Sequence, residues 1–356
     1  MAKQASGKKK PVKVGIIGLG RAGYGMHCGE LEPRGKKFTI VAGCDILKSK
    51  RDRFQERLPQ AKVYATVAEL IADPEVEIID IAHRTTEHVE TALLALKSGK
   101  NVFLEKPICE TYEEARQIQR AAGKAKGKLY IRHNRRFESA FTHIGEVMAG
   151  GVLGEVYEIK LCRHGFSRRS DWQTLKACGG GQLNNWGPHI IDQALRFLDS
   201  PVQEIWSDLK RIAAVGDAED HLKIVLKGKN SRIVDLEISG GVALGSPVYA
   251  VYGTLGSLIS ENEQTLKLRY LDPRNRLSPR KADPGDPGDS FGAPDNLKWI
   301  EKEIPVKPKC AVNLQSIWDY LYASLREGKP FPITTEQSVE VMRVIGEVKK
   351  GTKFAR

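Results

Sequence analysis

The segment Val12–Gly23 reads VKVGIIGLGRAG and decides the fold of the first part of the chain. Its first half, residues 12–17, is a short apolar run of the kind that forms a buried strand. A glycine-rich turn follows and leads into a predicted helix from about Arg21. The pattern G-x-G-x-x-G is common on its own, but a strand before it and a helix after it make it specific for dinucleotide binding.

The three glycines of this turn have different tasks. Gly18 permits the tight turn, Gly20 lets the backbone approach a pyrophosphate, and Gly23 lets the helix pack closely on the strand. The helix N-terminus at Arg21 and Ala22 supplies free N–H groups and a positive dipole, which favour a phosphate. The sequence therefore predicts that these five residues bind a dinucleotide cofactor.

Asp45 closes the second predicted strand, 25 residues after Gly20. A carboxylate at this place can accept hydrogen bonds from both ribose hydroxyls of NAD, and it repels a 2′-phosphate. NAD is therefore the predicted cofactor. Three cations follow closely in the sequence, namely Lys48, Arg51 and Arg53, so NADP is not excluded.

Strands and helices alternate through the first third of the chain. The predicted strands are 12–17, 38–44, 76–82, 101–104 and 128–132. Two of the helices between them begin at capping boxes, Thr66–Glu69 and Thr111–Glu114. Strict alternation with short loops predicts a doubly wound parallel sheet, that is, an α/β Rossmann domain over residues 11–133. Residues 1–10 are expected to form a flexible basic tail.

The pattern changes after this domain, where strands follow one another without intervening helices. The predicted strands are 156–166, 205–212, 221–226, 232–238, 248–252 and 265–271. Such a succession favours a large, open and mostly antiparallel sheet in an α+β domain over residues 134–356. Residues 272–296 are rich in Pro, Gly, Asp and Arg and are expected to form a long surface loop. Helices are predicted at 312–325 and 335–348.

The composition is that of an ordinary globular protein, with 41% hydrophobic and 28% charged residues. No apolar run approaches the ~20 residues that cross a bilayer, and the basic N-terminus lacks the apolar part of a secretory signal. The six cysteines never form a C-x-x-C pair, and no metal-ligand spacing is found. The net charge of +12 is spread along the chain without a nucleic-acid-binding motif. We therefore expect a cytoplasmic protein without a metal site and without a membrane or nucleic-acid partner.

A second candidate site is Glu105-Lys106-Pro107, at the end of the predicted strand 101–104. The carboxyl ends of strands in a doubly wound sheet face the ligand crevice, so Lys106 is expected where a nicotinamide ring and a substrate would meet. Burial in a dry cleft disfavours the charged form of a lysine, and Lys106 can then accept a proton near neutral pH. Pro107 is expected to hold a tight turn, with a cis bond as one option. The simple alternative is an exposed lysine followed by a proline.

A third candidate site lies in Gly179–Asp192, which reads GGGQLNNWGPHIID. A helix is predicted to begin near Pro188. His189 lies in its first turn and off its apolar stripe, and Asp192 follows at i+3 as the expected orienting partner. A lone helical histidine is often structural, but this placement makes His189 a candidate proton carrier.

Together these motifs resemble one family of oxidoreductases, the glucose–fructose oxidoreductase and inositol dehydrogenase family, written Gfo/Idh/MocA. The resemblance runs from Val12 to about Phe331, and it rests on Gly18–Gly23, the helix Thr86–Gly99, Glu105–Pro107, Arg135–Phe137, Gly179–Asp192, Gly253–Ser257 and Pro330–Pro332. It implies a Rossmann domain, a tightly held nicotinamide cofactor, and an open-sheet second domain that often forms the oligomer interface. A homodimer or homotetramer through the C-terminal sheet is therefore expected.

By the same resemblance, Lys106 matches the catalytic lysine and His189 the catalytic histidine. Four residues before His189 the family often carries an aspartate, whereas this chain has Asn185. An asparagine side chain cannot take a proton. The proton traffic is therefore expected to fall to Lys106 and His189, with Asn185 positioning the substrate.

Further cofactor contacts are expected from His83, Arg84, His88 and Glu105. The third predicted strand ends in His83-Arg84-Thr85, where family members commonly read Thr-Pro-Asn. This bulkier, basic edge has three possible partners: the nicotinamide amide, the pyrophosphate or an anionic group of the substrate.

Further substrate contacts are expected from Arg163, His164, Asp171 and Trp172. Asp171 can accept hydrogen bonds from vicinal hydroxyls, and Trp172 offers an apolar face that stacks on the C–H groups of a sugar. Arg163 and His164 end the first strand of the second domain and are expected to point to the same region. A solvated loop charge and a core tryptophan are the structural alternatives.

The sequence therefore predicts an NAD(P)-dependent oxidoreductase that acts on a ring hydroxyl or ring ketone of a sugar, glycoside or cyclitol. A hydride passes to or from nicotinamide C4 while Lys106 and His189 handle the proton. Three alternatives stay open. One is a glycoside-cleaving enzyme that uses transient oxidation and elimination, and another is an enzyme for a nucleotide sugar or an acid, with basic residues as anion clamps. The third is a cofactor-binding sensor or scaffold without activity.

Overall fold

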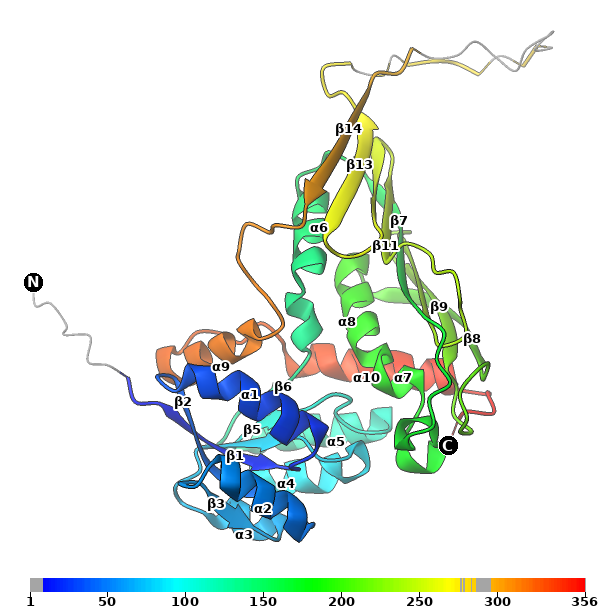
Figure 1. Ribbon diagram of the computed structural model, residues 1–356. Coiled ribbons are helices and arrows are strands. Elements are labelled where there is room, and N and C mark those ends of the chain that lie inside the picture. Colours follow the sequence, from blue (N-terminus) through cyan, green and yellow to red (C-terminus); the bar gives the residue numbers. More distant parts are fainter. Residues whose placement is uncertain (1–8, 276, 278, 283, 286–295, 356) are drawn as a thin grey trace, which may run out of the picture.

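The computed structural model describes residues 9–275, 277, 279–282, 284–285 and 296–355. In Figure 1 a domain drawn in blue and cyan lies beside a domain drawn mostly in green and yellow, and each is built around a sheet. No helix among the described residues is long and apolar enough to cross a membrane.

The first sheet has six parallel strands in the order β3-β2-β1-β4-β5-β6. The strands are β1 (Val12–Ile17), β2 (Phe38–Cys44), β3 (Lys62–Tyr64), β4 (Ile78–Ile81), β5 (Asn101–Leu104) and β6 (Leu129–Ile131). The predicted doubly wound sheet is confirmed, and the strand order reverses between β1 and β4. β3 was not predicted, because this three-residue edge strand has no buried side chain and hence no apolar signal.

The helices of this domain connect its strands. They are α1 (Cys28–Leu31), α2 (Lys48–Arg57), α3 (Val67–Ala72), α4 (His88–Lys97) and α5 (Tyr112–Lys124). Both predicted capping boxes are confirmed, since Thr66 and Thr111 each accept the backbone N–H three residues on. The helix after the glycine turn begins where predicted, but its first seven residues, Arg21–His27, are π-helical before α1 continues it.

The second sheet has eight strands in the order β14-β13-β12-β11-β7-β10-β9-β8. The strands are β7 (Val156–His164), β8 (Val202–Lys210), β9 (His221–Gly228), β10 (Ile233–Ser239), β11 (Tyr249–Gly253), β12 (Gly256–Ser260), β13 (Thr265–Leu271) and β14 (Trp299–Pro305). All neighbours are antiparallel except β7 and β10, which confirms the mostly antiparallel sheet. β12 and β14 were not predicted. β12 follows β11 after only two residues, and β14 is an edge strand without a buried side chain.

One face of the second sheet is apolar and covered by helices. The long helices beside it in Figure 1 are α6 (Ser139–Ala149), α8 (Gly187–Leu198) and α10 (Thr335–Lys349), and the one-turn helix α7 (Gln182–Asn185) leads into α8. α8 contacts β7, β9 and β10, and α10 contacts β8. Alternate residues of β9 and β10 supply the apolar face, among them Leu222, Ile224, Leu226, Val234 and Leu236, all fully buried.

The last two helices join the domains. α9 (Ser316–Glu327) returns to the first sheet, where the ring of buried Trp318 lies 4.8 Å from that of Phe103 in β5 and 5.7 Å from that of Phe38 in β2. α10 packs on both α5 and α8. The domain boundary after residue 133 stays a prediction, because a helix of the predicted second domain completes the core of the first.

Two expectations fall partly outside the described residues. Residues 1–8 of the expected flexible tail lie outside them, and so do residues 276, 278, 283 and 286–295 of the expected surface loop. The described residues of that loop between β13 and β14 form no helix or strand.

Candidate active site

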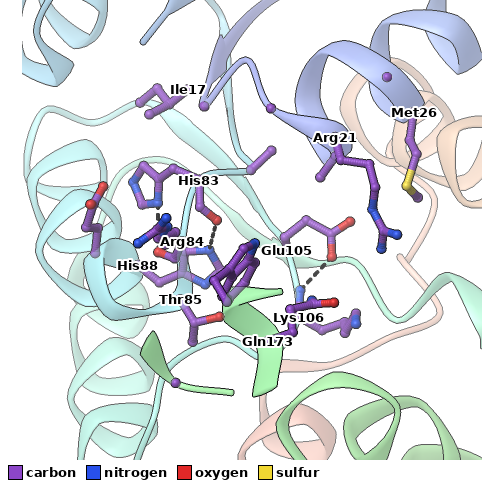
Figure 2. A pocket seen from close by; sticks show the side chains of 18 of the residues that line it. Ile17, Arg21, Met26, His83, Arg84, Thr85, His88, Glu105, Lys106 and Gln173 are labelled. Atoms are coloured by element: carbon purple, nitrogen blue, oxygen red, sulfur yellow. Dashed lines mark hydrogen bonds between the residues drawn. The ribbon is translucent and has the colours of Figure 1, made fainter. Parts of the chain in front are cut away.

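A cavity of about 1620 Å³ lies between the two domains. The loops after all six strands of the first sheet form one wall, as expected for a doubly wound sheet, and residues 169–173 and 179–189 contribute to the other. Figure 2 shows side chains of the first wall, including Arg21, His83, Glu105 and Lys106. Among the predicted cofactor residues, only Gly23 does not line the cavity.

The glycine turn leaves room for a phosphate. Gly18 has φ +91°, and a Cβ there would lie 2.5 Å from the backbone nitrogen of His83. A Cβ on Gly23 would lie 2.1 Å from the Gly18 oxygen, so Gly23 serves the close packing of helix and strand. Gly20 lines the cavity, and a Cβ there would meet no atom within 4 Å. The open space at Gly20 fits the pyrophosphate of a dinucleotide.

Asp45 organises the turns at the end of β2. Its Oδ2 accepts the backbone N–H of Leu19 at 2.9 Å, and its Oδ1 accepts that of Leu47 at 3.0 Å. Each carboxylate oxygen keeps a second lone pair for a ribose hydroxyl. Lys50 Nζ lies 3.4 Å from Asp45 Oδ2, and the Arg53 guanidinium stacks at 4.0 Å from the ring of Tyr24. Both cations line the cavity, so this end also has the charge to receive a 2′-phosphate.

The other predicted cations near Asp45 have different partners. Lys48 pairs with Asp52 at 2.8 Å, and Arg51 donates to the backbone oxygens of Asp45 and Ile46. Neither lines the cavity, whereas Lys50, which was not predicted, does.

His83 and His88 brace the loop after β4. His83 Nε2 lies 2.9 Å from Thr91 Oγ1. Burial lowers the pKa of His88 to about 4. Its neutral ring therefore has one N–H to donate, and the nearest acceptor is the backbone oxygen of Pro107, 2.9 Å from Nδ1. His88 thus ties this loop to the turn that carries Lys106.

Lys106 ends the loop after β5 and reaches across the cavity. Its peptide bond to Pro107 is cis, the option named from the sequence. Its Nζ donates to the backbone oxygen of Asn185 in α7 at 2.8 Å. Burial lowers the pKa of Lys106 to about 8, although the charge of Glu105 opposes this shift. A substantial fraction of the amine is therefore neutral near physiological pH.

His189 lines the same cavity from the first turn of α8. Its side chain is buried, and within the described part of the chain its Nδ1 has no hydrogen-bond partner. Burial lowers the pKa of His189 well below its usual range, and the cations Lys106 and Arg135 lower it further. The ring is therefore neutral at pH 7, and it can accept a hydrogen bond at one nitrogen and donate one from the other.

The predicted pairing of His189 with Asp192 is wrong. Both carboxylate oxygens of Asp192 accept from Arg136, in a bidentate ion pair that is almost fully buried. A guanidinium satisfies a buried carboxylate better than a neutral imidazole one turn away, because it offers two parallel charged donors.

Arg163 and His164 do not line the cavity, which corrects their predicted placement at the substrate. Consecutive residues of a strand point to opposite faces of the sheet. Arg163 reaches the Tyr249 hydroxyl and Glu263, each at 2.9 Å. His164 Nε2 lies 3.1 Å from Glu237. Arg163 thus serves an ion pair of β7, and His164 Nδ1 accepts the backbone N–H of Ser246 at 3.1 Å.

Asp171 and Trp172 line the cavity from the second domain, and their contact with a substrate stays a prediction. Asp171 accepts the backbone N–H of Gln173 at 2.8 Å and pairs with Arg169 at 2.7 Å. The Arg84 guanidinium lies 5.4 Å from the Trp172 ring centroid, so a cation of the first domain faces an aromatic ring of the second.

Several lining residues were not predicted as site residues. They are chiefly Arg132, Asn134 and Arg135 after β6, Arg169 and Gln173 in the second wall, and Trp186 between α7 and α8. Lys106 was located by the rule that the carboxyl ends of the strands face the ligand crevice, which we call the carboxyl-end rule. The same rule applies to β6 and would have found Arg132, Asn134 and Arg135. The Arg135 guanidinium lies 4.1 Å from the ring centroid of Trp186, a contact that no sequence spacing indicates.

Comparison with known families agrees with this architecture. Residues 12–133 match the model of an oxidoreductase family with an NAD-binding Rossmann fold. Residues 141–259 match the model of the GFO/IDH/MocA C-terminal domain.

Individual relatives and solved structures extend the likeness over almost the whole chain. The scyllo-inositol 2-dehydrogenase (NADP(+)) of Bacillus subtilis is 25% identical over 357 residues, which cover 98% of this chain and 96% of the relative. The myo-inositol 2-dehydrogenase of Thermotoga maritima is 25% identical, over 70% of this chain and 75% of the relative. An NAD-binding protein from Listeria innocua has a similar structure, with a TM-score of 0.82, 23% identity, and coverage of 98% of this chain and 99% of that one. This structural similarity, at 23% sequence identity, shows the fold alone.

Proposed function

The chain belongs to the Gfo/Idh/MocA family of NAD(P)-binding oxidoreductases, and from this premise we propose that it interconverts a ring hydroxyl and a ring ketone of a cyclitol or sugar. Two of its relatives are named as inositol 2-dehydrogenases, which favours a cyclitol. The cavity supports the proposal because its lining includes groups that bind hydroxyls: an amine, a neutral imidazole, and asparagine and glutamine side chains. It also contains several arginines, among them Arg84, Arg135 and Arg169, which is why acids belong in the substrate panel below.

In the proposed reaction, Lys106 takes the proton of the reacting hydroxyl. Its lowered pKa gives a neutral amine with a free lone pair near pH 8. His189 lines the same cavity as Lys106, and its neutral ring can hydrogen-bond to the reacting hydroxyl. In the reverse direction, protonated Lys106 returns the proton to the ketone oxygen.

The glycine turn and Asp45 would hold the cofactor. Gly20 leaves space for the pyrophosphate, and Asp45 keeps lone pairs for a ribose. When bound, the nicotinamide supplies the redox chemistry, taking up or giving back the hydrogen of the substrate carbon. The protein holds the cofactor and the substrate in one orientation, which makes the reaction between two molecules effectively unimolecular, and it excludes water from the site.

The observation that carries the proposal is the hydrogen bond from Lys106 Nζ to the Asn185 backbone. It holds the amine of the first domain against the wall that carries His189, within one cavity that also contains the glycine turn. A proton carrier placed beside a dinucleotide site is the arrangement that dehydrogenation of an alcohol requires.

The test is a substrate panel. Purified protein with NAD, and separately with NADP, is mixed with inositol isomers, aldoses, aldonic and uronic acids and aryl glycosides, and NAD(P)H formation is followed by absorbance. We expect turnover of a cyclitol or sugar. Cleavage of an aryl glycoside without net NADH would instead support the elimination route, and absence of both would contradict the proposal.

A further inference from the structure

We propose that His27 is a positioning residue for Lys106 that acts through the carboxylate of Glu105; this inference rests on the proposed function of Lys106. His27 ends the helical turn after the glycine motif and is fully buried. Its Nδ1 lies 2.7 Å from Asp80 Oδ2, and its Nε2 lies 3.0 Å from Glu105 Oε1. His27 therefore bridges two carboxylates, one in β4 and one just after β5.

The two contacts of His27 indicate its charge. Carboxylates only accept hydrogen bonds, so both ring nitrogens must donate, and a ring with two N–H groups is an imidazolium. Burial alone lowers the pKa of His27, but the charge of Asp80 and the hydrogen bonds with Asp80 and Glu105 raise it to about 9. His27 thus supplies a buried positive charge between the two carboxylates.

Glu105 is held by a longer network. Its Oε1 also accepts from Arg132 Nη1 at 2.9 Å, and Arg132 Nη2 donates to Glu30 at 2.5 Å. Trp318 Nε1 in α9 donates to the same Glu30 oxygen at 2.6 Å. Hydrogen bonds therefore connect the C-terminal part of the chain with the residue before Lys106.

The charges of this network balance. Three carboxylates, those of Glu30, Asp80 and Glu105, pair with two cations, those of His27 and Arg132. The charge of Lys106 is the third positive charge beside Glu105 while the amine is protonated. A buried carboxylate that loses its cation is strongly destabilised. A test of His27 must therefore remove a positive and a negative charge together.

The network fixes Lys106 at its backbone. Glu105 Oε2 accepts the backbone N–H of Lys106 at 2.9 Å, while Lys106 Nζ is held by Asn185. With the His27 contact to Oε1 removed, the Glu105 carboxylate has one restraint fewer and can turn away from the Lys106 N–H. A displacement of a catalytic group by about 1 Å costs on the order of 10²-fold in rate.

The experiment compares three variants with the unmodified chain of 356 residues. H27Q/D80N removes the His27 bridge and keeps the net charge, and E105Q removes the carboxylate itself. K223Q/D235N makes the same change of charge at an ion pair of 3.0 Å between β9 and β10, remote from Lys106, and serves as the matched control. Thermal unfolding and a fluorescence titration with NADH report folding and cofactor binding.

The first measurement needs no substrate. Lys106 is labelled with trace acetic anhydride over a range of pH and quantified by mass spectrometry. The charge of Glu105 raises the pKa of Lys106, while the cations Arg21, Arg132 and Arg135 lower it and are kept in every variant. We expect the labelling midpoint to fall by about one pH unit in E105Q and roughly half a unit in H27Q/D80N. An unchanged midpoint in folded H27Q/D80N overturns the inference.

The second measurement uses a substrate found in the panel. For H27Q/D80N we expect kcat to fall by about 10²-fold while KM and the Kd of NADH change little, and we expect no change in K223Q/D235N. If kcat of H27Q/D80N equals that of the unmodified chain, His27 only balances the charge of the carboxylates and does not position Lys106. If the unmodified chain turns over no polyol, the proposed function fails, but the labelling result still decides the role of His27.

A third measurement uses the unmodified chain, in case H27Q/D80N does not fold. Nitrogen-15 NMR of the histidine side chains at pH 7 should show a ring with two slowly exchanging N–H groups, which is assigned to His27 with the H27Q variant. A neutral ring at this position would overturn the inference, because a neutral imidazole donates only one hydrogen bond.

Discussion

Lys106 and Asn185 meet across the cavity, with Lys106 Nζ 2.8 Å from the Asn185 backbone oxygen. The bond joins the end of β5 in the first domain to α7 in the second. A neutral amine keeps two hydrogens, so Lys106 can donate to this carbonyl and still accept a proton on its lone pair. The contact therefore holds the amine in one direction in both charge states, as a proton carrier requires.

Removing the amine should stop the chemistry and leave the cofactor bound. Lys106→Met keeps most of the side-chain length, and we expect kcat to fall by about 10²–10⁴-fold, the usual contribution of a general base. NADH affinity, measured by fluorescence, should stay unchanged. Lys128→Met, at an exposed lysine just before β6, is the control. Full turnover by the Lys106 variant would remove this residue from the mechanism.

The rate of oxidation should rise with pH. The pKa of Lys106 is lowered to about 8, and the neutral amine is the form that accepts the hydroxyl proton. We therefore expect kcat/KM for oxidation to increase up to about pH 8 and then level off. We expect kcat/KM for ketone reduction, which needs the protonated amine, to stay level up to about pH 8 and then decrease. Stopped-flow or steady-state rates in buffers of constant ionic strength measure kcat/KM in both directions. A profile that is flat across this range in both directions would contradict the assignment.

Two glycines of the same turn should respond differently to substitution by alanine. Gly20→Ala adds a methyl group that meets no protein atom but enters the space proposed for the pyrophosphate. We expect at least about tenfold weaker NADH binding, or ~1.4 kcal/mol, with an unchanged Tm. Gly23→Ala forces a methyl group to 2.1 Å from the Gly18 oxygen, and we expect a clearly lower Tm. Equal cofactor affinity of Gly20→Ala and the unmodified chain would place the dinucleotide elsewhere.

The charge of Asp45 should set the preference between the two nicotinamide cofactors. Asp45→Asn keeps an oxygen that can accept the Leu19 N–H and removes the charge that repels a 2′-phosphate, while Lys50 and Arg53 remain. We expect the ratio of NADPH to NADH affinity to rise by about tenfold. Asp52→Asn, at an exposed carboxylate in α2, is the control. An unchanged ratio would mean that Asp45 only holds the turns together.

Local rules account for what the sequence predicted correctly. The glycine spacing and the two capping boxes each depend on residues a few positions apart, and both are confirmed. The carboxyl-end rule placed Lys106 in the cavity because it follows from the topology of a parallel sheet. The short edge strands β3 and β14 were missed because an edge strand without buried side chains has no apolar pattern.

Partners distant in sequence explain the errors. Asp192 was assigned to His189 from their spacing, but Arg136, 56 residues earlier, takes both of its oxygens. No sequence pattern indicates His27 as a site residue, because its partners Asp80 and Glu105 lie 53 and 78 residues away. Only the assembled sheet brings these groups together, which is why buried charge networks escape pattern analysis.

The charge of His27 should also make stability depend on pH in a defined direction. Its pKa is raised from 6.5 to about 9 in the folded chain. The stabilisation from its bound proton is therefore complete below about pH 6.5, the value expected for the unfolded chain, and is lost as the pH rises toward 9. Lys106 acts in the opposite sense, because its lowered pKa makes stability rise with pH, but only above about pH 8.

The window from about pH 6.5 to 8 therefore isolates His27 from Lys106. One titrating proton changes the free energy of unfolding by up to ~1.4 kcal/mol per pH unit, so we expect the stability of the unmodified chain, relative to that of H27Q/D80N, to fall by about 1.5 kcal/mol across this window. Urea unfolding of both proteins at several pH values measures this difference, because His88 and His189, whose lowered pKa values make stability rise with pH just above 6.5, contribute equally to the two proteins. If the free energy of unfolding has the same pH dependence in both proteins, His27 is not protonated in the folded chain. Its contacts with Asp80 and Glu105 would then be ordinary hydrogen bonds and not ion pairs.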